Sequence, residues 1–267
     1  MKTKHTSILY LSGISAVLTI FLFLWRIGGN IYGENPESFF TVCGGDERKP
    51  SSDIPVGRLY NSKSGKTICT AWRASNGVFV TAAHCLSPGL GFDEIHFTVP
   101  DSLCDGTPVL PPASHRFKIN AASIKSKFDM KTRQDWAIFT ILYHPGTELP
   151  EILRKGYFFT ISNEQILKNK PVQVDVSGFG DDFRKINHCL SKNRTLQTDS
   201  SSGYLSDGWF THSSDTRIGS SGSPVYRRDT KGNLLVYGIH RGGNCPNIST
   251  TVLSPDFRKA LNEFNEK

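Results

Sequence analysis

Short β-type segments recur along most of this 267-residue chain. Each is rich in valine, isoleucine, phenylalanine or threonine, and glycine, proline, asparagine or aspartate separates it from the next. Segments of this length, composition and spacing are typical of an antiparallel sandwich or barrel. The stretch 143–156 has proline, glycine and charge but no strand period, so it is predicted to connect two β-rich halves. The clearest strand segments are 69–74, 77–82, 94–99, 136–142, 157–161, 172–179 and 234–240.

The end of the chain has a different pattern. Ser254 and Pro255 are typical of a helix N-cap and first helical position. Phe257, Leu261 and Phe264 follow at the spacing of one helix face. The pattern predicts a C-terminal α-helix that covers an apolar surface of an all-β body.

The first thirty residues differ from the rest. Lys2 and Lys4 precede the run 7–25, which contains no charged residue before Arg26. A basic start followed by an apolar run is typical of an export signal, and a bilayer-spanning helix needs about 20 such residues. Residues 1–30 are therefore predicted to be a signal peptide or a signal anchor. Either one places the remaining chain outside the cytoplasm, secreted or membrane-anchored through residues 7–25.

Cysteine content and charge narrow the class of protein further. Six cysteines in an exported chain favour disulfides, and without a Cys-x-x-Cys pair a zinc ribbon is not expected. The net charge of +7 suggests an anionic partner. However, lysine and arginine are scattered and not interleaved with aromatic residues, so the prediction is a basic surface that binds no nucleic acid. We expect no metal and no cofactor.

Three polar residues have unusual settings. His84 lies in "VFVTAAHC", where an apolar strand ends among small residues that leave its imidazole accessible. Asp135 opens the strongly apolar "DWAIFTIL", and Ser221 lies in the glycine-flanked turn "GSSGSP". A buried acid can hold a histidine in the tautomer that activates a serine hydroxyl. Asp129 is a poorer candidate for the acid because its surroundings are polar and charged.

The segments "TAAHC", "DWAI" and "GSSGSP", in that order, resemble the three signature segments of the trypsin/chymotrypsin superfamily of serine peptidases. The resemblance covers roughly 54–267, and "SGFG" at 177–180 is similar to a further family turn. It implies a chymotrypsin-like fold of two six-stranded Greek-key β-barrels. The first barrel would span 54–145, after an N-terminal extension at 31–53, and the second would span 146–267.

The resemblance also implies the roles of these residues. Ser221 would be the nucleophile, His84 the general base and Asp135 the orienting acid, in the cleft between the barrels. The backbone N–H groups of Gly219 and Ser221 would form the oxyanion hole.

The cysteines are read in the same way. A Cys69–Cys85 disulfide would close a short loop that carries His84, as in the family. Four cysteines then remain and allow three pairings. The position that usually pairs with Cys245 holds Arg217, so the working guess is that Cys189 pairs with Cys245 and Cys43 with Cys104.

Ser220 departs from the trypsin pattern, which has an aspartate here that pairs with a new N-terminal amine after zymogen cleavage. The neutral Ser220 implies that this activation switch is absent. The form "GSSGSP" and the segment "GIHRGG" instead resemble the glutamyl endopeptidase branch. There, His240 and Thr216 would bind a substrate carboxylate, and Ser223 would pack behind the nucleophile.

The specificity pocket remains open between three readings. Asp215 matches the trypsin residue that binds arginine or lysine, whereas His240 favours glutamate, and Gly242 and Gly243 would form the pocket wall. In the third reading, Asp215 and His240 pair and leave a smaller neutral pocket.

The sequence thus predicts a monomeric exported serine endopeptidase acting on proteins or peptides. The alternative is an idle homologue with a complete triad that serves binding or adhesion. An α/β-hydrolase esterase is not supported, because it requires the order serine, acid, histidine.

Overall fold

The computed structural model describes residues 42–52, 55–74, 77–103, 107–142, 153, 158–164, 170–181, 185–186, 189–190 and 195–265. The chain divides into two compact units, Met1–Ser38 and Phe39–Lys267. The first unit contains the predicted signal peptide or anchor and lies outside the described residues. So do most of the expected connection 143–156 and Cys104. Within the described part, no helix is long and apolar enough to cross a membrane.

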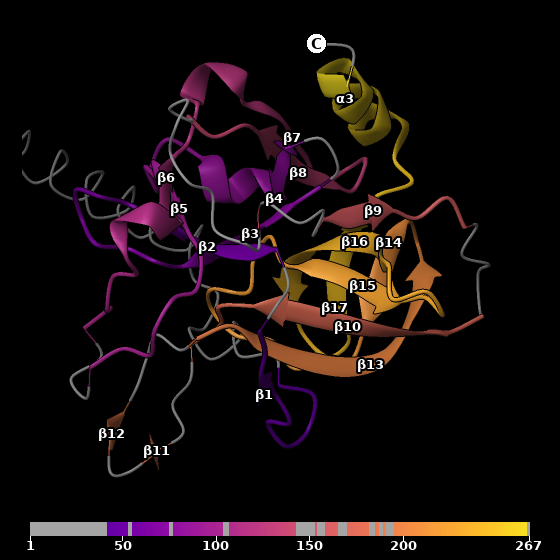
Figure 1. The fold of residues 1–267 in the computed structure, drawn as a ribbon. Helices are drawn as coiled ribbons and strands as arrows, with labels where there is room; N and C mark the ends of the chain where they lie inside the picture. Colours follow the sequence, from indigo (N-terminus) through magenta and orange to yellow (C-terminus); the bar gives the residue numbers. More distant parts are fainter. Residues whose placement is uncertain are drawn as a thin grey trace, which may run out of the picture. The chain divides into compact units, whose positions relative to one another are not determined.

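The first half of the described chain forms one antiparallel sheet (Figure 1). Its strand order is β6-β5-β2-β3-β4-β8-β7. Hydrogen bonds from Asn120 N to Thr140 O and from Leu142 N to Lys118 O join the chain after β6 to the chain after β8, so the sheet curls on itself. The strands are β2 (Val56–Tyr60), β3 (Cys69–Arg73), β4 (Phe79–Thr81), β5 (Glu94–His96), β6 (Arg116–Lys118), β7 (Lys125–Asp129) and β8 (Gln134–Phe139).

The second half forms a closed six-stranded barrel. The order β13-β10-β15-β16-β17-β14 is closed by pairing between β13 and β14. Two short strands add to it: β1 (Lys49–Pro50) pairs with β13, and β9 (Phe159–Ile161) runs parallel to β16. The barrel strands are β10 (Val172–Gly178), β13 (Gln197–Ser206), β14 (Trp209–His212), β15 (Pro224–Arg228), β16 (Leu234–Gly243) and β17 (Asn247–Thr251), and a separate hairpin contains β11 (Lys185–Ile186) and β12 (Cys189–Leu190).

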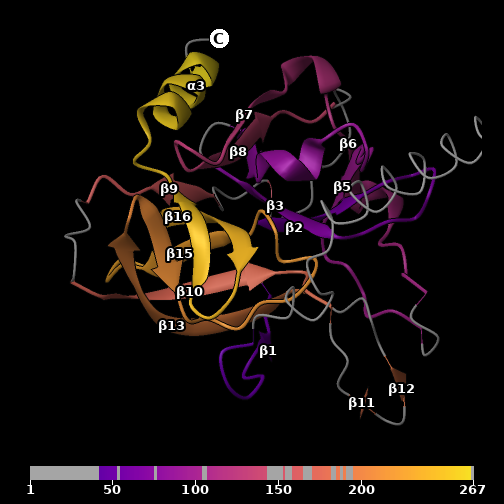
Figure 2. The ribbon, with the colours of Figure 1, turned by 180° about the vertical axis from the view of Figure 1, so that it is seen from behind.

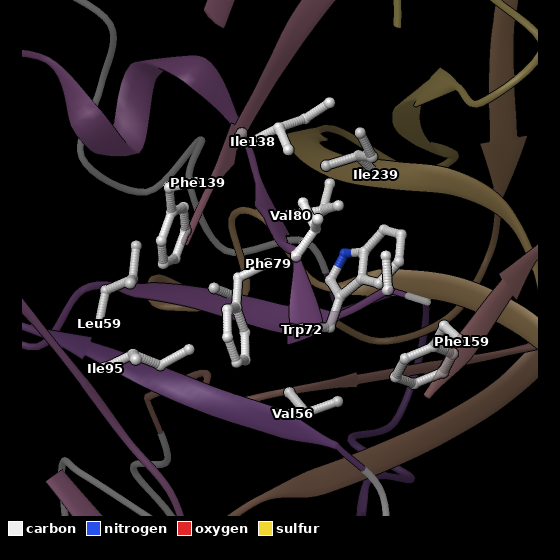
Figure 3. Close-up of a cluster of buried hydrophobic side chains, with 14 of the residues drawn as sticks. Val56, Leu59, Trp72, Phe79, Val80, Ile95, Ile138, Phe139, Phe159 and Ile239 are labelled. Atoms are coloured by element: carbon white, nitrogen blue, oxygen red, sulfur yellow. The ribbon is translucent and has the colours of Figure 1, made fainter. Parts of the chain in front are cut away.

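A continuous apolar layer joins the two sheets (Figure 3). Trp72 on β3 and Phe159 on β9 meet edge to face, with ring centroids 5.4 Å apart. Ile239 on β16 packs into the same cluster as Phe79 and Val80 of β4. Because burial of such side chains stabilises a fold by about 1.5–3 kcal/mol each, this layer fixes how the two halves meet.

The predicted C-terminal helix is present as α3 (Pro255–Asn265) and lies over β8 (Figure 2). The hydroxyl of Ser254 accepts the N–H of Phe257 at 3.5 Å, as expected of an N-cap. Phe257 and Leu261 are buried, and Phe257 meets Trp136 of β8 edge to face at 5.7 Å.

The chymotrypsin-like two-barrel fold with a C-terminal helix is therefore confirmed. One detail differs from the expectation of two six-stranded barrels. The first sheet has seven strands, because the hairpin partner β7 extends it beyond β8.

Candidate active site

His84 and Asp135 lie side by side although they are far apart in the sequence. His84 is in the 3-10 turn Ala83–Leu86 that follows β4, and Asp135 is the second residue of β8, which pairs with β4. Nδ1 of His84 is 2.7 Å from Oδ2 of Asp135, and the backbone N–H of His84 donates to Oδ1 at 3.0 Å. A carboxylate only accepts hydrogen bonds, so Nδ1 carries the proton and Nε2 is left as a base.

The environments of the two side chains differ. The side chain of Asp135 is fully buried, whereas that of His84 is 32% exposed. Nε of Arg241 lies 3.5 Å from Oδ2 and adds a positive charge beside the buried carboxylate. The backbone N–H of Asp135 donates to Oγ1 of Thr250 at 2.9 Å, which ties β8 to β17 of the second barrel. The acid is thus fixed from both halves of the fold.

The Cys69–Cys85 disulfide is present as expected, and the chain on both sides of it contacts the backbone of Ser221. The N–H of Thr70, next to Cys69, donates to the carbonyl of Ser221 at 2.8 Å. Sγ of Cys85, next to His84, lies 3.7 Å from the same oxygen. The cysteine sulfurs and His84 form a cluster of metal-ligand type, but both sulfurs are in the disulfide and offer no thiolate.

The hydroxyl of Ser221 donates to the backbone carbonyl of Arg241 at 3.3 Å. It is therefore turned toward β16 and not toward His84. Catalytic hydrogen bonds are often long or misaligned without substrate, and rotation about one side-chain bond redirects a hydroxyl.

The backbone around Gly219 exposes two N–H groups. Gly219 has φ +104°, and a Cβ there would overlap the carbonyl oxygen of Phe179. Its own carbonyl accepts the hydroxyl of Thr70 at 2.8 Å. In the part of the chain that the structure describes, the N–H groups of Gly219 and Ser221 meet no protein acceptor. Two free donors in one turn can bind a developing oxyanion.

Asp215 is engaged by the N-terminal segment. Its two carboxylate oxygens accept the N–H groups of Cys43 at 2.7 Å and Glu47 at 2.8 Å, and the residue is 5% exposed. This geometry does not support a role in binding a substrate arginine or lysine. The reading in which Asp215 pairs with His240 is wrong, because His240 pairs with His212 instead.

His240 on β16 and His212 on β14 form a buried pair, with Nδ1 of His240 3.2 Å from Nε2 of His212. Burial lowers the pKa of His212 to about 3. Burial, together with the charges of His212, His84 and Arg241, holds the pKa of His240 well below its usual range. Both imidazoles are therefore neutral at physiological pH.

The remaining predicted pocket residues lie around this pair. The hydroxyl of Thr216 donates to Asn247 Oδ1 at 3.2 Å, and Ser223 is fully buried. Gly242 and Gly243 have φ values of +132° and +135° at the end of β16, where a bulge interrupts the pairing with β17. A Cβ on Gly242 would meet nothing within 4 Å, so there is open space beside it.

The guessed cysteine pairing is wrong. Cys43 is bonded to Cys245, with Cα atoms 5.5 Å apart, a normal distance for a disulfide. The reason is that the N-terminal segment folds back along the second barrel, where β1 pairs with β13 and Asp215 binds the N–H of Cys43.

Three functional candidates were not found from the sequence. His212 carries a weak signal, because a histidine in an apolar strand needs a partner. Arg241 and Arg48 carry none, since their roles depend on contacts with Asp135 and with the turn at 180–181, far away in the sequence.

Comparison with known proteins agrees with this fold. The family model described as Trypsin matches residues 42–265. The crystal structure of the protease Anisep from Arthrobacter nicotinovorans superposes with a TM-score of 0.56 at 12% sequence identity. The match covers 82% of this chain and 100% of that chain, and at this identity it shows the fold alone. No curated protein sequence matches this chain.

Proposed function

This chain belongs to the trypsin family, and we propose that it is a serine endopeptidase with Ser221 as nucleophile. The observation that carries the proposal is the 2.7 Å contact between Nδ1 of His84 and the buried carboxylate of Asp135. Burial keeps water from competing for the carboxylate, so the imidazole stays in the tautomer that accepts a proton at Nε2.

The reaction would proceed in two halves. Ser221 Oγ attacks the peptide carbonyl carbon as His84 Nε2 takes the hydroxyl proton, and the carbonyl oxygen becomes an oxyanion. The N–H groups of Gly219 and Ser221 stabilise that oxyanion, and each such donor is worth about 10²–10³ in rate. His84 then gives its proton to the leaving amine, which leaves an acyl-enzyme on Ser221. Water, activated by His84, hydrolyses the ester and restores the hydroxyl.

For specificity we propose a preference for glutamate before the scissile bond. The engaged carboxylate of Asp215 supports this choice over arginine or lysine. The neutral pair supports it too. Nδ1 of His212 is buried and has no hydrogen-bond partner among the described residues. An unpaired buried N–H is less favourable than an unpaired acceptor, so Nδ1 is the acceptor and Nε2 of His212 donates to Nδ1 of His240. Nε2 of His240 then carries the hydrogen and can donate a hydrogen bond to a substrate carboxylate.

We further propose that the protein works outside the cytoplasm, as a monomer that is secreted or anchored through residues 7–25. The two disulfides found among the described residues support an oxidising compartment. The net charge of +7 favours the approach of acidic substrates.

A peptide-library digest tests the activity and the specificity together. The full-length chain is incubated with the library beside Ser221→Ala, and the residue before each cut is identified by mass spectrometry. We expect cleavage after glutamate by the wild type only. Cleavage after arginine or lysine would overturn the proposed pocket. No cleavage by the folded wild type would favour the idle homologue that serves binding or adhesion.

A further inference from the structure

The residue just before Ser221 is the uncharged Ser220, which forms no ion pair that could hold the turn. Ser220 is buried, and among the described residues its hydroxyl accepts the N–H of Arg217, at 3.2 Å. Its backbone N–H donates to the carbonyl of Arg217 at 2.9 Å. Neither of these bonds involves the carbonyl of Ile218 or the N–H of Gly219, the two polar groups of the neighbouring Ile218–Gly219 peptide.

That peptide is held by the turn at 180–181. The N–H of Asp181 donates to the carbonyl of Ile218 at 2.6 Å. In a trans peptide the carbonyl and the N–H point in opposite directions. The N–H of Gly219 is thereby directed away from Asp181, and no described protein group accepts it. If the Asp181 turn moved, this donor would be free to rotate out of the oxyanion hole.

Arg48 holds the Asp181 turn. Its guanidinium donates to the carbonyl of Asp181 at 3.0 Å and to that of Gly180 at 3.4 Å. Asp46 binds the same guanidinium in a bidentate pair, at 2.9 and 2.8 Å. Arg48 is 4% exposed, so water does not compete for these hydrogen bonds. Hydrogen bonds from a charged donor are stronger than neutral ones.

Gly180 brings this cation next to the serine turn. A Cβ on Gly180 would lie 2.6 Å from Ser220 Oγ and 2.9 Å from Nη1 of Arg48. The absence of a side chain there therefore lets the guanidinium and Ser220 pack against one backbone position. Asp46 also reaches the base of the turn, since its Oδ2 lies 3.6 Å from Nε of Arg217.

Arg48 belongs to a segment, 43–51, that we call the N-terminal strap. The strap is attached at both ends. Cys43 is bonded to Cys245 and its N–H to Asp215, while β1 pairs with β13 and Ser51 N donates to Leu196 O at 2.8 Å. A cation on a strap fixed in this way cannot easily leave its position.

We propose that Arg48 is a positioning residue that orients the N–H of Gly219 in the oxyanion hole, through the contacts Arg48–Asp181 and Asp181–Ile218. The strap thus places the Asp46–Arg48 ion pair beside a turn in which Ser220 is uncharged. The hole is therefore formed without cleavage of the chain before the strap. The inference rests on the proposed function, because it assigns a catalytic consequence to the same turn.

The test compares Arg48→Gln with Lys49→Gln in the full-length chain. Lys49 is the next residue of the strap and is exposed, so it controls for a lost charge at this place. We expect Arg48→Gln to lower kcat about 10²-fold or more, with little change in KM. The inhibition constant of a peptide aldehyde, whose bound form carries the oxyanion, should rise by a similar factor. Arg48→Lys, which keeps a cation with fewer donors, should fall in between.

The inference is overturned if kcat of Arg48→Gln lies within twofold of Lys49→Gln. If Arg48→Gln does not fold, Asp46→Asn replaces it, because it loosens the guanidinium without removing it, and the same comparison decides. A second readout does not need activity. In a Ser221→Ala background, the amide NMR signal of Gly219 should shift in Arg48→Gln and stay in place in Lys49→Gln.

The two proposals fail in different ways. A folded wild type that cleaves no peptide contradicts the proposed function, and the Gly219 signal still decides the role of Arg48. An active wild type with an active Arg48→Gln contradicts only the positioning role.

Discussion

At the scale of single residues, the site depends on one fully buried carboxylate. Asp135 accepts two hydrogen bonds from His84 and lies 3.5 Å from Nε of Arg241. An asparagine of the same shape would present an N–H₂ group to Nδ1 and favour the wrong tautomer of His84.

Asp135→Asn is therefore expected to lower kcat about 10⁴-fold with little change in KM. Steady-state kinetics on one peptide substrate measure both quantities. Asp129→Asn is the matched control, since Asp129 is half-buried and its carboxylate accepts hydrogen bonds from Lys131 and Thr132 of its own turn. Equal activity of the two variants would remove Asp135 from the mechanism.

Gly219→Ala should impair the oxyanion hole. The added Cβ meets the carbonyl oxygen of Phe179 and strains a backbone at φ +104°, so we expect kcat to fall about 10²–10³-fold. Gly232→Ala separates the steric contact from the backbone strain, because Gly232 also has a positive φ, +83°, but an added Cβ there would meet nothing within 4 Å. An active Gly219→Ala enzyme would show that this turn does not hold the oxyanion.

The buried histidine pair should make stability depend on pH. The pKa of His212 is about 3 in the fold because of burial, against about 6.5 in an unfolded chain. Between these values the unfolded chain binds more protons, so the free energy of unfolding falls as pH falls below 6.5 and is unaffected above it.

Urea unfolding at pH 7.5 and 4.5 measures this dependence. The loss of unfolding free energy between the two pH values should be roughly 2–3 kcal/mol smaller in His212→Gln than in the wild type. Parallel behaviour of the two proteins would mean that His212 is not buried in its neutral form.

At the scale of elements, the N-terminal strap links β13, the serine turn and the chain between β16 and β17, where Cys245 lies. Asp215 is its anchor. Hydrogen bonds to a charged group contribute about 1.5–3 kcal/mol each, so the two N–H groups of Cys43 and Glu47 hold the strap firmly.

Asp215→Asn should loosen this anchor without changing specificity. We expect a lower unfolding midpoint and a lower kcat, while the residue before the cut stays the same in a library digest. Asp207→Asn, in the exposed turn between β13 and β14, controls for the loss of one negative charge. A change in the residue preferred before the cut would show that Asp215 does contribute to the specificity pocket.

The sequence predicts the apolar elements well and the polar ones poorly. Strands such as β8, whose residues are all buried, are visible from composition alone. β13 contains "DSSSG" and has no clear alternation, yet it is one of the longest strands, because β10 and β14 both pair with it. Backbone hydrogen bonding of this kind does not require particular side chains, so it cannot be predicted from the sequence pattern.

At the scale of the whole molecule, the site is assembled from two sheets. His84 and Asp135 come from the first, and Ser221, His240 and Asp215 come with the second. The contact between His84 and Asp135 could be predicted because their local motifs are distinctive, whereas the catalytic roles of His84, Asp135 and Ser221 stay predictions. The strap could not be predicted, because Arg48 acts on a turn more than a hundred residues away, and its neighbours in the sequence give no sign of that contact.

A fluorophosphonate probe tests most directly whether Ser221, His84 and the oxyanion hole act together. The probe phosphonylates a serine only when a base and oxyanion donors are in place. The full-length chain is labelled, digested and mapped by mass spectrometry, beside His84→Ala. We predict one adduct, on Ser221, which is lost in His84→Ala. A folded wild type without an adduct on Ser221, or an equal adduct in His84→Ala, would contradict the serine peptidase mechanism.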